Sequence, residues 1–237
     1  MAARATRSAS RAASSDDDSE RCLLLALSHD ELGVIVDGLA DPLQPVVAVA
    51  FSSTCLGLRT PLQAALEVLK ERHARAVVLC RKMKMSCAGL RDAEELHWGG
   101  KGLTADDMAT LGMLLSKWLP RLQRLRLFNN SLGDAGMQAL CEGLGRGSAP
   151  ALCVLALNFN HFGPAGAEAL AAALRRGAMP NIERVSLTRN PIGNQGVAAL
   201  AAPLRKLPAL ERLGLGNCKL GDEGVASLVA NLGKDDF

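Results

Sequence analysis

The stretch Leu-Gln-Arg-Leu-Arg-Leu-Phe-Asn-Asn, which runs from Leu122 to Asn130, occurs in four similar copies in this sequence. The later copies begin at Leu152, Ile182 and Leu210, at spacings of 30, 30 and 28 residues. Each copy is followed by an apolar residue and a glycine, and then by apolar residues at helical spacing. Self-similarity at a nearly fixed period indicates one supersecondary unit that stacks on itself. The sequence therefore predicts a repeat array.

Within one copy, the residue types separate into a strand and a turn. Leu155 and Leu157 are two residues apart, so a short strand would point both side chains to one face. Asn160 follows where the chain must turn away from the strand. A buried carboxamide there can bond the backbone groups that a bend leaves unpaired, and the next copy offers Asn190 at the same level. Cys218 fills this position in the last copy as a small residue with a weak donor.

The second half of each copy has the spacing of a helix. Ala169, Leu170 and Leu174 repeat as Ala199, Leu200 and Leu204 in the next copy. Residue types that are common at an N-cap or in a first turn mark where we expect each helix to begin: Asp134, Pro164, Asn194 and Asp222.

The full pattern, Leu-x-x-Leu-x-Leu-x-x-Asn/Cys-x-Leu, resembles leucine-rich repeats of the ribonuclease-inhibitor type. The resemblance implies an α/β fold, a right-handed horseshoe with parallel strands on the concave side and helices on the convex side. We assign the repeat domain to residues 76–237, with clear repeats at 122–151, 152–181, 182–209 and 210–237. A degenerate repeat covers 93–121, where Lys101 replaces the asparagine. The apolar run from Ala76 to Cys80 is predicted to be a strand at the edge of the sheet.

Composition excludes several classes of function. A net charge of +3 over 237 residues is too near neutral to indicate nucleic-acid binding, and no apolar run is long enough to span a membrane. The seven cysteines are odd in number and include no Cys-x-x-Cys pair, which favours reduced thiols and an intracellular protein, cytoplasmic or nuclear. Residues 1–20 are rich in Ala, Ser and Arg; they are interpreted as a disordered tail, and an organelle transit peptide stays the alternative.

Residues 21–75 show helical spacing without the repeat. Ser28 and Glu31 form the pattern of a capping box, a second helix is expected from Val46 to Arg59, and Pro61 is expected to begin a third. This segment resembles an F-box, the module that docks substrate receptors onto cullin-type ubiquitin ligases, although Ser28 stands in place of its proline and Cys55 in place of its tryptophan. The resemblance implies that the adaptor would be bound by Leu27, Asp30, Ile35, Leu39, Phe51 and Leu58. The alternative is a plain helical cap for the repeats.

We find no pattern for a catalytic centre, a metal site or a cofactor, so the sequence predicts a non-enzymatic protein. Strand residues that alternate with the buried leucines should form an exposed concave face. Arginine and aromatic side chains are frequent anchors of interfaces, and arginine suits carboxylates, so an acidic protein target is expected here. The candidate partner-binding residues on this face are Arg124, Arg126, Phe128, Asn158, Arg184, Arg189 and Arg212. The alternative is that these residues only keep the sheet hydrated.

The predicted function is that of a protein-interaction scaffold, with the F-box resemblance implying a substrate receptor of a ubiquitin ligase. The alternatives are a GTPase-activating protein of the nuclear-transport type, which repeats of this kind also build, and a plain structural adaptor. The last predicted helix carries Val225, Leu228, Val229 and Leu232 with few polar residues after it. We therefore expect exposed aliphatic side chains at this end, and with them either a longer array or end-to-end association with another molecule.

Overall fold

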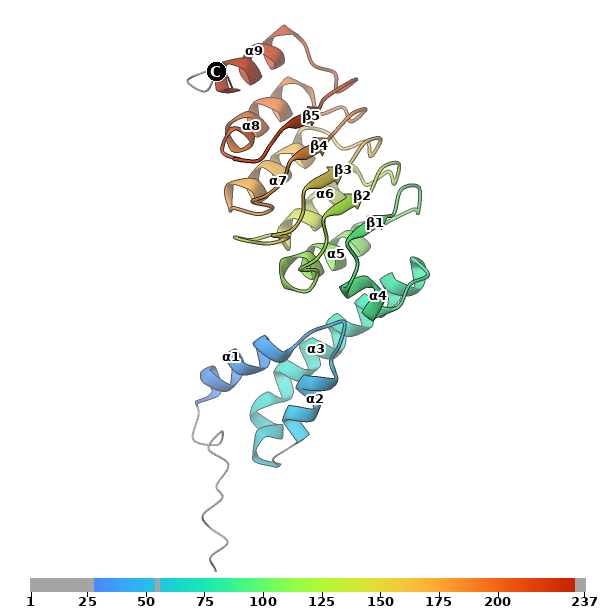
Figure 1. Ribbon diagram of the computed structural model, residues 1–237, viewed down its shortest axis with the longest axis vertical. Helices are drawn as coiled ribbons and strands as arrows, with labels where there is room; N and C mark the ends of the chain where they lie inside the picture. The colour runs from blue at the N-terminus through green and yellow to red at the C-terminus, as the bar shows by residue number, and fades with distance from the viewer. Residues whose placement is uncertain (1–27, 54–55, 233–237) are drawn as a thin grey trace, which may run out of the picture.

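The chain forms a helical N-terminal unit followed by a stack of strand–helix repeats (Figure 1). The computed structural model describes residues 28–53 and 56–232. The N-terminal helices are α1 (His29–Leu39), α2 (Val46–Ser53), α3 (Leu56–Lys82) and α4 (Cys87–Arg91). The repeats then give β1 (Glu95–His97), α5 (Ala105–Lys117), β2 (Arg124–Arg126), α6 (Gly133–Glu142), β3 (Val154–Ala156), α7 (Pro164–Arg175), β4 (Arg184–Ser186), α8 (Gly193–Arg205), β5 (Arg212–Gly214) and α9 (Asp222–Leu232).

The strands form one parallel sheet in the order β1-β2-β3-β4-β5, the same order as in the sequence. Helices α5 to α9 stack in the same order on one side of the sheet (Figure 1). A helix therefore connects each strand to its parallel neighbour, as this topology requires. The predicted α/β horseshoe is confirmed.

The core lies between the strands and the helices. Leu127, Leu157 and Leu187 occupy equivalent positions after three strands and are all fully buried. The helices approach one another closely at small residues. A Cβ atom on Gly112 of α5 would lie 2.3 Å from the carbonyl oxygen of Leu140 in α6, so only glycine permits this contact. Each repeat thus buries its apolar face against the next.

A ladder of asparagines holds the turns that follow the strands. Asn160 is fully buried; its Oδ1 accepts from the backbone N–H of Asn130 at 2.9 Å, and its Nδ2 donates to the carbonyls of Leu127 and Leu157, both at 2.9 Å. Asn190 Oδ1 accepts in turn from the backbone N–H of Asn160 at 2.8 Å. The predicted role of the buried carboxamide is confirmed, because each one pairs backbone groups of its own repeat and of the preceding one.

The thiol of Cys218 extends the ladder in the last repeat. Its Sγ donates to the carbonyl of Leu187 at 3.3 Å, where an asparagine would donate its amide. In the first repeat, Lys101 stands at the asparagine position, and Asn130 Oδ1 accepts from its backbone N–H at 2.9 Å, the same contact that Asn160 makes with Asn130. The degenerate repeat is therefore tied to the array by its neighbour's side chain.

Two of the predicted helix-start residues act on the next repeat and not on their own helix. Asp134 lies in the first turn of α6, but its Oδ1 accepts from the backbone N–H groups of Gly163 and Gly166 at the start of α7, both at 2.7 Å. Asn194 Oδ1 likewise accepts from the backbone N–H of Gly221 at 2.9 Å. These side chains satisfy helix N-terminal donors across the repeat boundary.

The predicted strand at residues 76–80 is wrong, because these residues lie inside α3. Ala76, Leu79 and Cys80 are buried at the spacing of one helical face, and Leu62 and Leu69 continue that face toward the N-terminus. The β-branched pair Val77-Val78 favours a strand locally, but burial of the helical face outweighs that preference. The predicted boundary between residues 75 and 76 thus falls within one continuous helix.

The N-terminal helices also differ from their predicted bounds. The second helix ends at Ser53 and not at Arg59, and α3 begins at Leu56, so that Pro61 lies inside α3 and does not begin it. At α1, the predicted capping box is confirmed: Ser28 Oγ accepts from the backbone N–H of Glu31, and Glu31 Oε2 accepts from the backbone N–H of Ser28.

Helix α3 belongs to two cores at once. Its first half packs with α1 and α2 around a small core that includes Leu32, Val36 and Leu69. Its second half, with Leu79 and Cys80, belongs to the large core of the repeats. One long helix therefore joins the helical unit to the stack.

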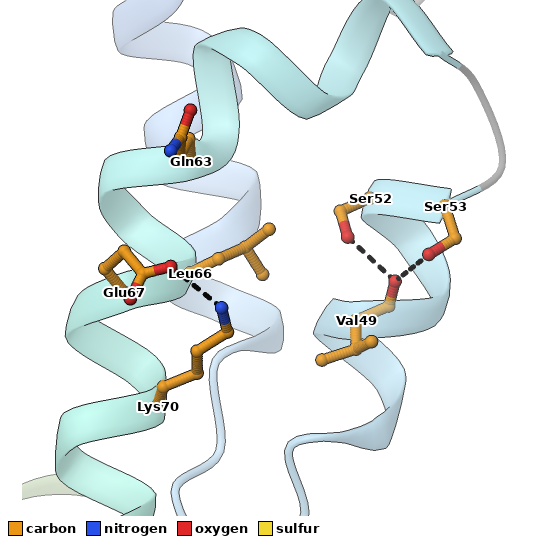
Figure 2. Close-up of a pocket in the computed structure, with 7 residues that line it drawn as sticks. All are labelled: Val49, Ser52, Ser53, Gln63, Leu66, Glu67 and Lys70. Atoms are coloured by element: carbon orange, nitrogen blue, oxygen red, sulfur yellow. Dashed lines mark hydrogen bonds and ion pairs between the residues drawn. The ribbon is translucent and has the colours of Figure 1, made fainter.

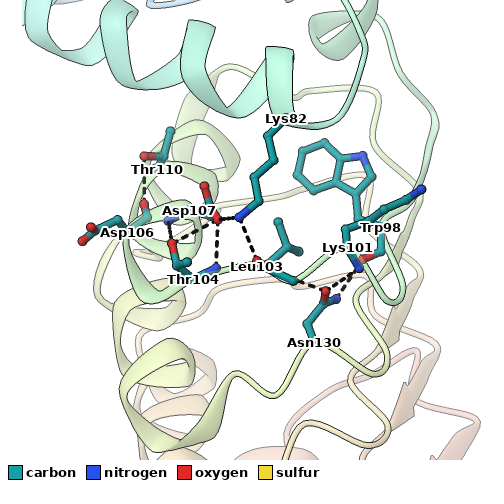
Figure 3. A network of polar contacts seen from close by, with 10 residues as sticks. Lys82, Trp98, Lys101, Leu103, Thr104, Asp106, Asp107, Thr110 and Asn130 are labelled. Carbon is teal, nitrogen blue, oxygen red and sulfur yellow. Dashed lines mark hydrogen bonds and ion pairs between the residues drawn. The ribbon is translucent and has the colours of Figure 1, made fainter.

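A polar network fastens the end of α3 to the first repeat (Figure 3). Lys82 Nζ donates to Asp107 Oδ2 at 2.5 Å and to the carbonyl oxygen of Gly102 at 2.8 Å. Asp107 also forms a capping box with Thr104 at the start of α5. Burial raises the pKa of Asp107, but the hydrogen bonds from Lys82 and Thr104 outweigh it and hold this pKa below its ordinary value.

At the other end of the stack, aliphatic side chains of α9 are exposed. Val225 is 50% exposed and Val229 is 60% exposed, whereas Leu228 is partly buried against the core. The expected exposure is confirmed for these two valines.

Candidate functional site

The face of the sheet that turns away from the helices is the candidate site, and we call it the concave face. Leu96, Leu125, Leu155 and Val185 point from the strand centres into the core, so the flanking strand residues point outward. The strand register aligns the outward residues in rows. The first row is Glu95, Arg124, Val154, Arg184 and Arg212, and the second is His97, Arg126, Ala156, Ser186 and Gly214. This is the register that the repeat spacing predicts.

At the β1–β2 end of the concave face, the positive charges already have a partner. Glu95 forms ion pairs with Arg124 and with Arg126, the latter at 3.8 Å, and its Oε2 lies 2.9 Å from His97 Nε2. Arg126 also contacts the His97 ring nitrogen. The hydrogen bonds from His97 and Arg124 lower the pKa of Glu95, so this carboxylate stays ionised at neutral pH. Two of the predicted acid-binding arginines are therefore compensated within the molecule.

Two exposed phenylalanines follow β2 and β3. Phe128 is 43% exposed, and its ring lies over Gly99, where a Cβ atom would meet the ring at 2.3 Å. Phe159 is 38% exposed on the loop after β3 and has a left-handed backbone, with φ of 57°. The guanidinium of Arg189 lies 4.8 Å from the centre of the Phe159 ring, a cation–π contact. An aromatic pair with an adjacent cation is typical of interface anchors.

Sequence reasoning missed Phe159 and the role of Glu95. The signal for Phe159 was available, because the loop position after each strand holds Asn129, Phe159, Arg189 and Asn217, all with positive φ. A large aromatic residue at a position otherwise filled by polar residues indicates a surface with a role beyond packing. Glu95 stands in the same row as Arg124, but the register alone does not show that its carboxylate also reaches Arg126.

At the β4–β5 end, the arginines have no such partner. Arg184 and Arg212 are register neighbours on adjacent strands, and both are exposed. No carboxylate of the described residues forms an ion pair with either. The floor beside them is small and polar: a Cβ atom on Gly214 would lie 3.0 Å from Ser186 Oγ and 3.2 Å from Thr188 Oγ1.

Asn158 lies between these two ends. Its side chain is half-buried, and its Oδ1 is a buried atom that has no hydrogen-bond partner among the described residues. A buried acceptor without a partner costs about 1 to 3 kcal/mol, so Asn158 does not stabilise the stack as Asn160 does.

A comparison with protein-family models agrees with the repeat pattern. A family model described as Leucine Rich repeat matches residues 120–141, 152–171, 178–201 and 206–229. Residues 120–229 carry leucine-rich repeats. A search of the curated proteins finds no match. Among solved structures, the chain is similar to "Leiomodin-1 Actin-Binding Site 2 (ABS2)", with 15% identity over 68% of this chain and 86% of that chain, and a TM-score of 0.49.

The repeats present their strands as one continuous sheet, and the helical unit presents a second candidate surface on α2. Val46, Val47 and Val49 of α2 are exposed by 69%, 48% and 46%, while Ala48 is buried. A cavity of about 420 Å³ lies between α2 and α3 (Figure 2). Its lining residues are Val49, Ser52, Ser53, Gln63, Leu66, Glu67 and Lys70.

Five of the residues implied by the F-box resemblance lie on α1, α2 and α3. Leu39 and Phe51 are half-buried and pack against the small core of α1, α2 and α3, and Ile35 on α1 is half-buried as well. Asp30 lies in α1 and Leu58 in α3, not at the end of the second helix. Leu27 lies outside the described residues.

The described residues hold no group of three or more His, Cys, Asp or Glu side chains that could bind a metal ion. The described cysteines are free thiols, and burial raises the pKa of Cys141 to about 12, so this thiol stays protonated. None of the helices in residues 28–53 and 56–232 is long and apolar enough to cross a membrane.

Proposed function

We propose that this chain is a non-enzymatic scaffold whose concave face binds a protein partner. The observation that carries the proposal is the concentration of interface-forming side chains on this one face. Phe128, Phe159, Arg184 and Arg212 are held in fixed register by the sheet and by the asparagine ladder beneath the loops. Such preorganisation lowers the entropic cost of binding a partner.

Steric blocking of the concave face tests this proposal. Ala156 lies in the middle of the second row, between Arg126 and Ser186, so Ala156→Trp would obstruct the face without removing any charge. Ala165 is exposed on α7, away from the sheet, and Ala165→Trp is the matched control. Proteins that copurify with the unaltered chain from its cell of origin should fall at least about tenfold with Ala156→Trp and persist with Ala165→Trp.

Equal recovery of partners with both variants would refute the concave face as the binding surface. Urea unfolding of the two variants must first show the same midpoint as the unaltered chain, since a misfolded variant would lose partners for another reason.

As a second role we propose that the helical unit binds the adaptor of a cullin-type ubiquitin ligase. The exposed valines of α2 support this role, because an apolar helix surface of this kind is costly unless another molecule covers it. Val46→Asp alters only an exposed position, and Val34→Asp is a matched control on the exposed side of α1. Adaptor and cullin should copurify with the unaltered chain and with Val34→Asp, and should be lost with Val46→Asp. Absence of the adaptor from the unaltered chain would refute this role.

A further inference from the structure

The arginines of the concave face divide into two pairs with opposite electrostatic surroundings. Arg124 and Arg126 share the carboxylate of Glu95, and His97 completes that network. Arg184 and Arg212 lie on neighbouring strands, and neither forms an ion pair with a carboxylate of the described residues. The intervening residue of the first row is Val154, which is neutral. Positive charge that is open to a partner is therefore concentrated over β4 and β5.

The pairing of Arg184 with Arg212 is unfavourable in the free protein. Neighbouring strands lie about 4.8 Å apart, and like charges directly opposite each other destabilise a sheet. One carboxylate placed between the two guanidinium groups would accept from both, which converts the repulsion into charge-assisted hydrogen bonds. At the other end of the row, Glu95 shows that a carboxylate can serve two arginines on these strands.

The floor beside this arginine pair suits an extended chain. The residues there are small: hydroxyl groups come from Ser186 and Thr188, and bare backbone comes from Gly214 and Gly216. The hydroxyl groups of Ser186 and Thr188 lie 3.5 Å apart and lean toward β5. They can donate to or accept from the backbone of a bound peptide. Beyond them, Arg189 and Phe159 offer a cation and an aromatic ring at the loop edge.

We propose that β4 and β5 form an acidic-peptide site, in which one Asp or Glu carboxylate of the protein partner bridges Arg184 and Arg212. The β1–β2 end does not bind an acidic group of the partner, because Arg124 and Arg126 already form ion pairs with Glu95. This inference rests on the proposed scaffold function, and it names the chemistry and the place of one contact within it.

A matched pair of double variants tests the site. Arg184→Gln/Arg212→Gln and Arg124→Gln/Arg126→Gln remove the same net charge from the same face. The probe is a fluorescein-labelled ten-residue peptide of alternating Glu and Gly, followed by fluorescence anisotropy at low salt, with a Gln and Gly peptide as control. The first double variant should bind the acidic peptide at least about tenfold more weakly, and the second should stay within about twofold of the unaltered protein.

A third variant should strengthen binding of the acidic peptide, if Glu95 is what keeps Arg124 and Arg126 from binding it. Glu95→Gln releases Arg124 and Arg126, so binding of the acidic peptide should increase. Equal losses in the two double variants would overturn the proposal in favour of unspecific attraction to a basic surface. No binding of the peptide to the unaltered protein would overturn it as well. Displacement of the peptide by inorganic phosphate at a concentration where acetate has no effect would show a phosphate site and refute the carboxylate site.

The test of the scaffold function can fail or succeed independently of the test of the acidic-peptide site. If Ala156→Trp abolishes partner capture while Arg184→Gln/Arg212→Gln leaves it unchanged, the scaffold function stands and the acidic-peptide site is refuted.

Discussion

The asparagine ladder makes a strong prediction about stability, and Asn160→Ala is the change that tests it. The backbone N–H of Asn130 donates to Asn160 Oδ1, and without that oxygen it would be left buried and unpaired. The carbonyls of Leu127 and Leu157 would each lose one of two donors, because Asn130 Nδ2 still donates to Leu127 and Asn190 Nδ2 still donates to Leu157. The main cost is therefore one orphaned donor.

An orphaned buried donor costs about 1 to 3 kcal/mol, and the small cavity left by the amide adds to this. We expect Asn160→Ala to lower the free energy of unfolding by about 2 to 4 kcal/mol. Urea unfolding followed by circular dichroism measures it, provided that the slope of the transition stays the same. Asn160→Cys should cost less, because the Cys218 sulfur at the same level of the last repeat accepts from the backbone N–H of Asn190 and also donates to the carbonyl of Leu187.

Asn158→Ala is the matched control, two residues earlier on the same strand and loop. The Asn158 side chain makes no hydrogen bond with the described residues, and its Oδ1 is buried without a partner. This variant should not lower the free energy of unfolding by more than about 0.5 kcal/mol, because it removes an acceptor that has no partner. Similar losses of unfolding free energy in Asn158→Ala and Asn160→Ala would show that the hydrogen bonds of the asparagine ladder do not stabilise the turns.

Three further predictions concern the core, the joint and the exposed end. Leu157→Ala should lower the free energy of unfolding by about 2 to 5 kcal/mol because this side chain is fully buried, whereas Arg126→Ala should lower it by under about 0.5 kcal/mol. Equal shifts in the urea midpoint would contradict the assignment of Leu157 to the buried face and Arg126 to the exposed face. The pKa of Asp107 is lowered in the folded protein, so its contribution to stability is present above the unfolded pKa of about 3.9 and is lost as the pH falls through the folded value. The difference in the free energy of unfolding between the unaltered chain and Asp107→Asn should therefore shrink below about pH 4. A difference that does not change with pH would rule out this carboxylate as the cause. The exposed valines of α9 should promote association at high concentration, so light scattering should show a rise in mass that Val229→Lys removes; a mass that is constant over the concentration range would contradict it.

The repeat itself could be read directly from the sequence, because the periodicity is imposed by the stacking. A spacing of 29 residues places Leu96 opposite Leu125, and a spacing of 30 places Leu125 opposite Leu155, so the strand register and the rows of the concave face follow from counting. The role of Asn160 could be predicted for the same reason, since a turn after every strand leaves the same backbone groups unpaired in every repeat.

Local preference alone could not identify the form of residues 76–80. Val77 and Val78 favour a strand, but the partners that decide the matter lie far away in the sequence, in the α5 helix and in the first repeat. Lys82 reaches Asp107 and Gly102 only because α3 continues to this point as a helix. The local sequence pattern of residues 76–80 cannot predict a contact between residues so far apart in the chain.

The division of the concave face was likewise decided by tertiary structure. Composition and spacing make Arg124, Arg126, Arg184 and Arg212 look equivalent, since all four lie on outward positions of short strands. Only the side-chain geometry shows that Glu95 compensates the first two. The sequence by itself determined the repeat, its register and the buried ladder, because these depend on identical contacts made again in each unit. The tertiary structure decided which charges remain open to a partner, because that depends on single contacts between particular side chains that no period repeats.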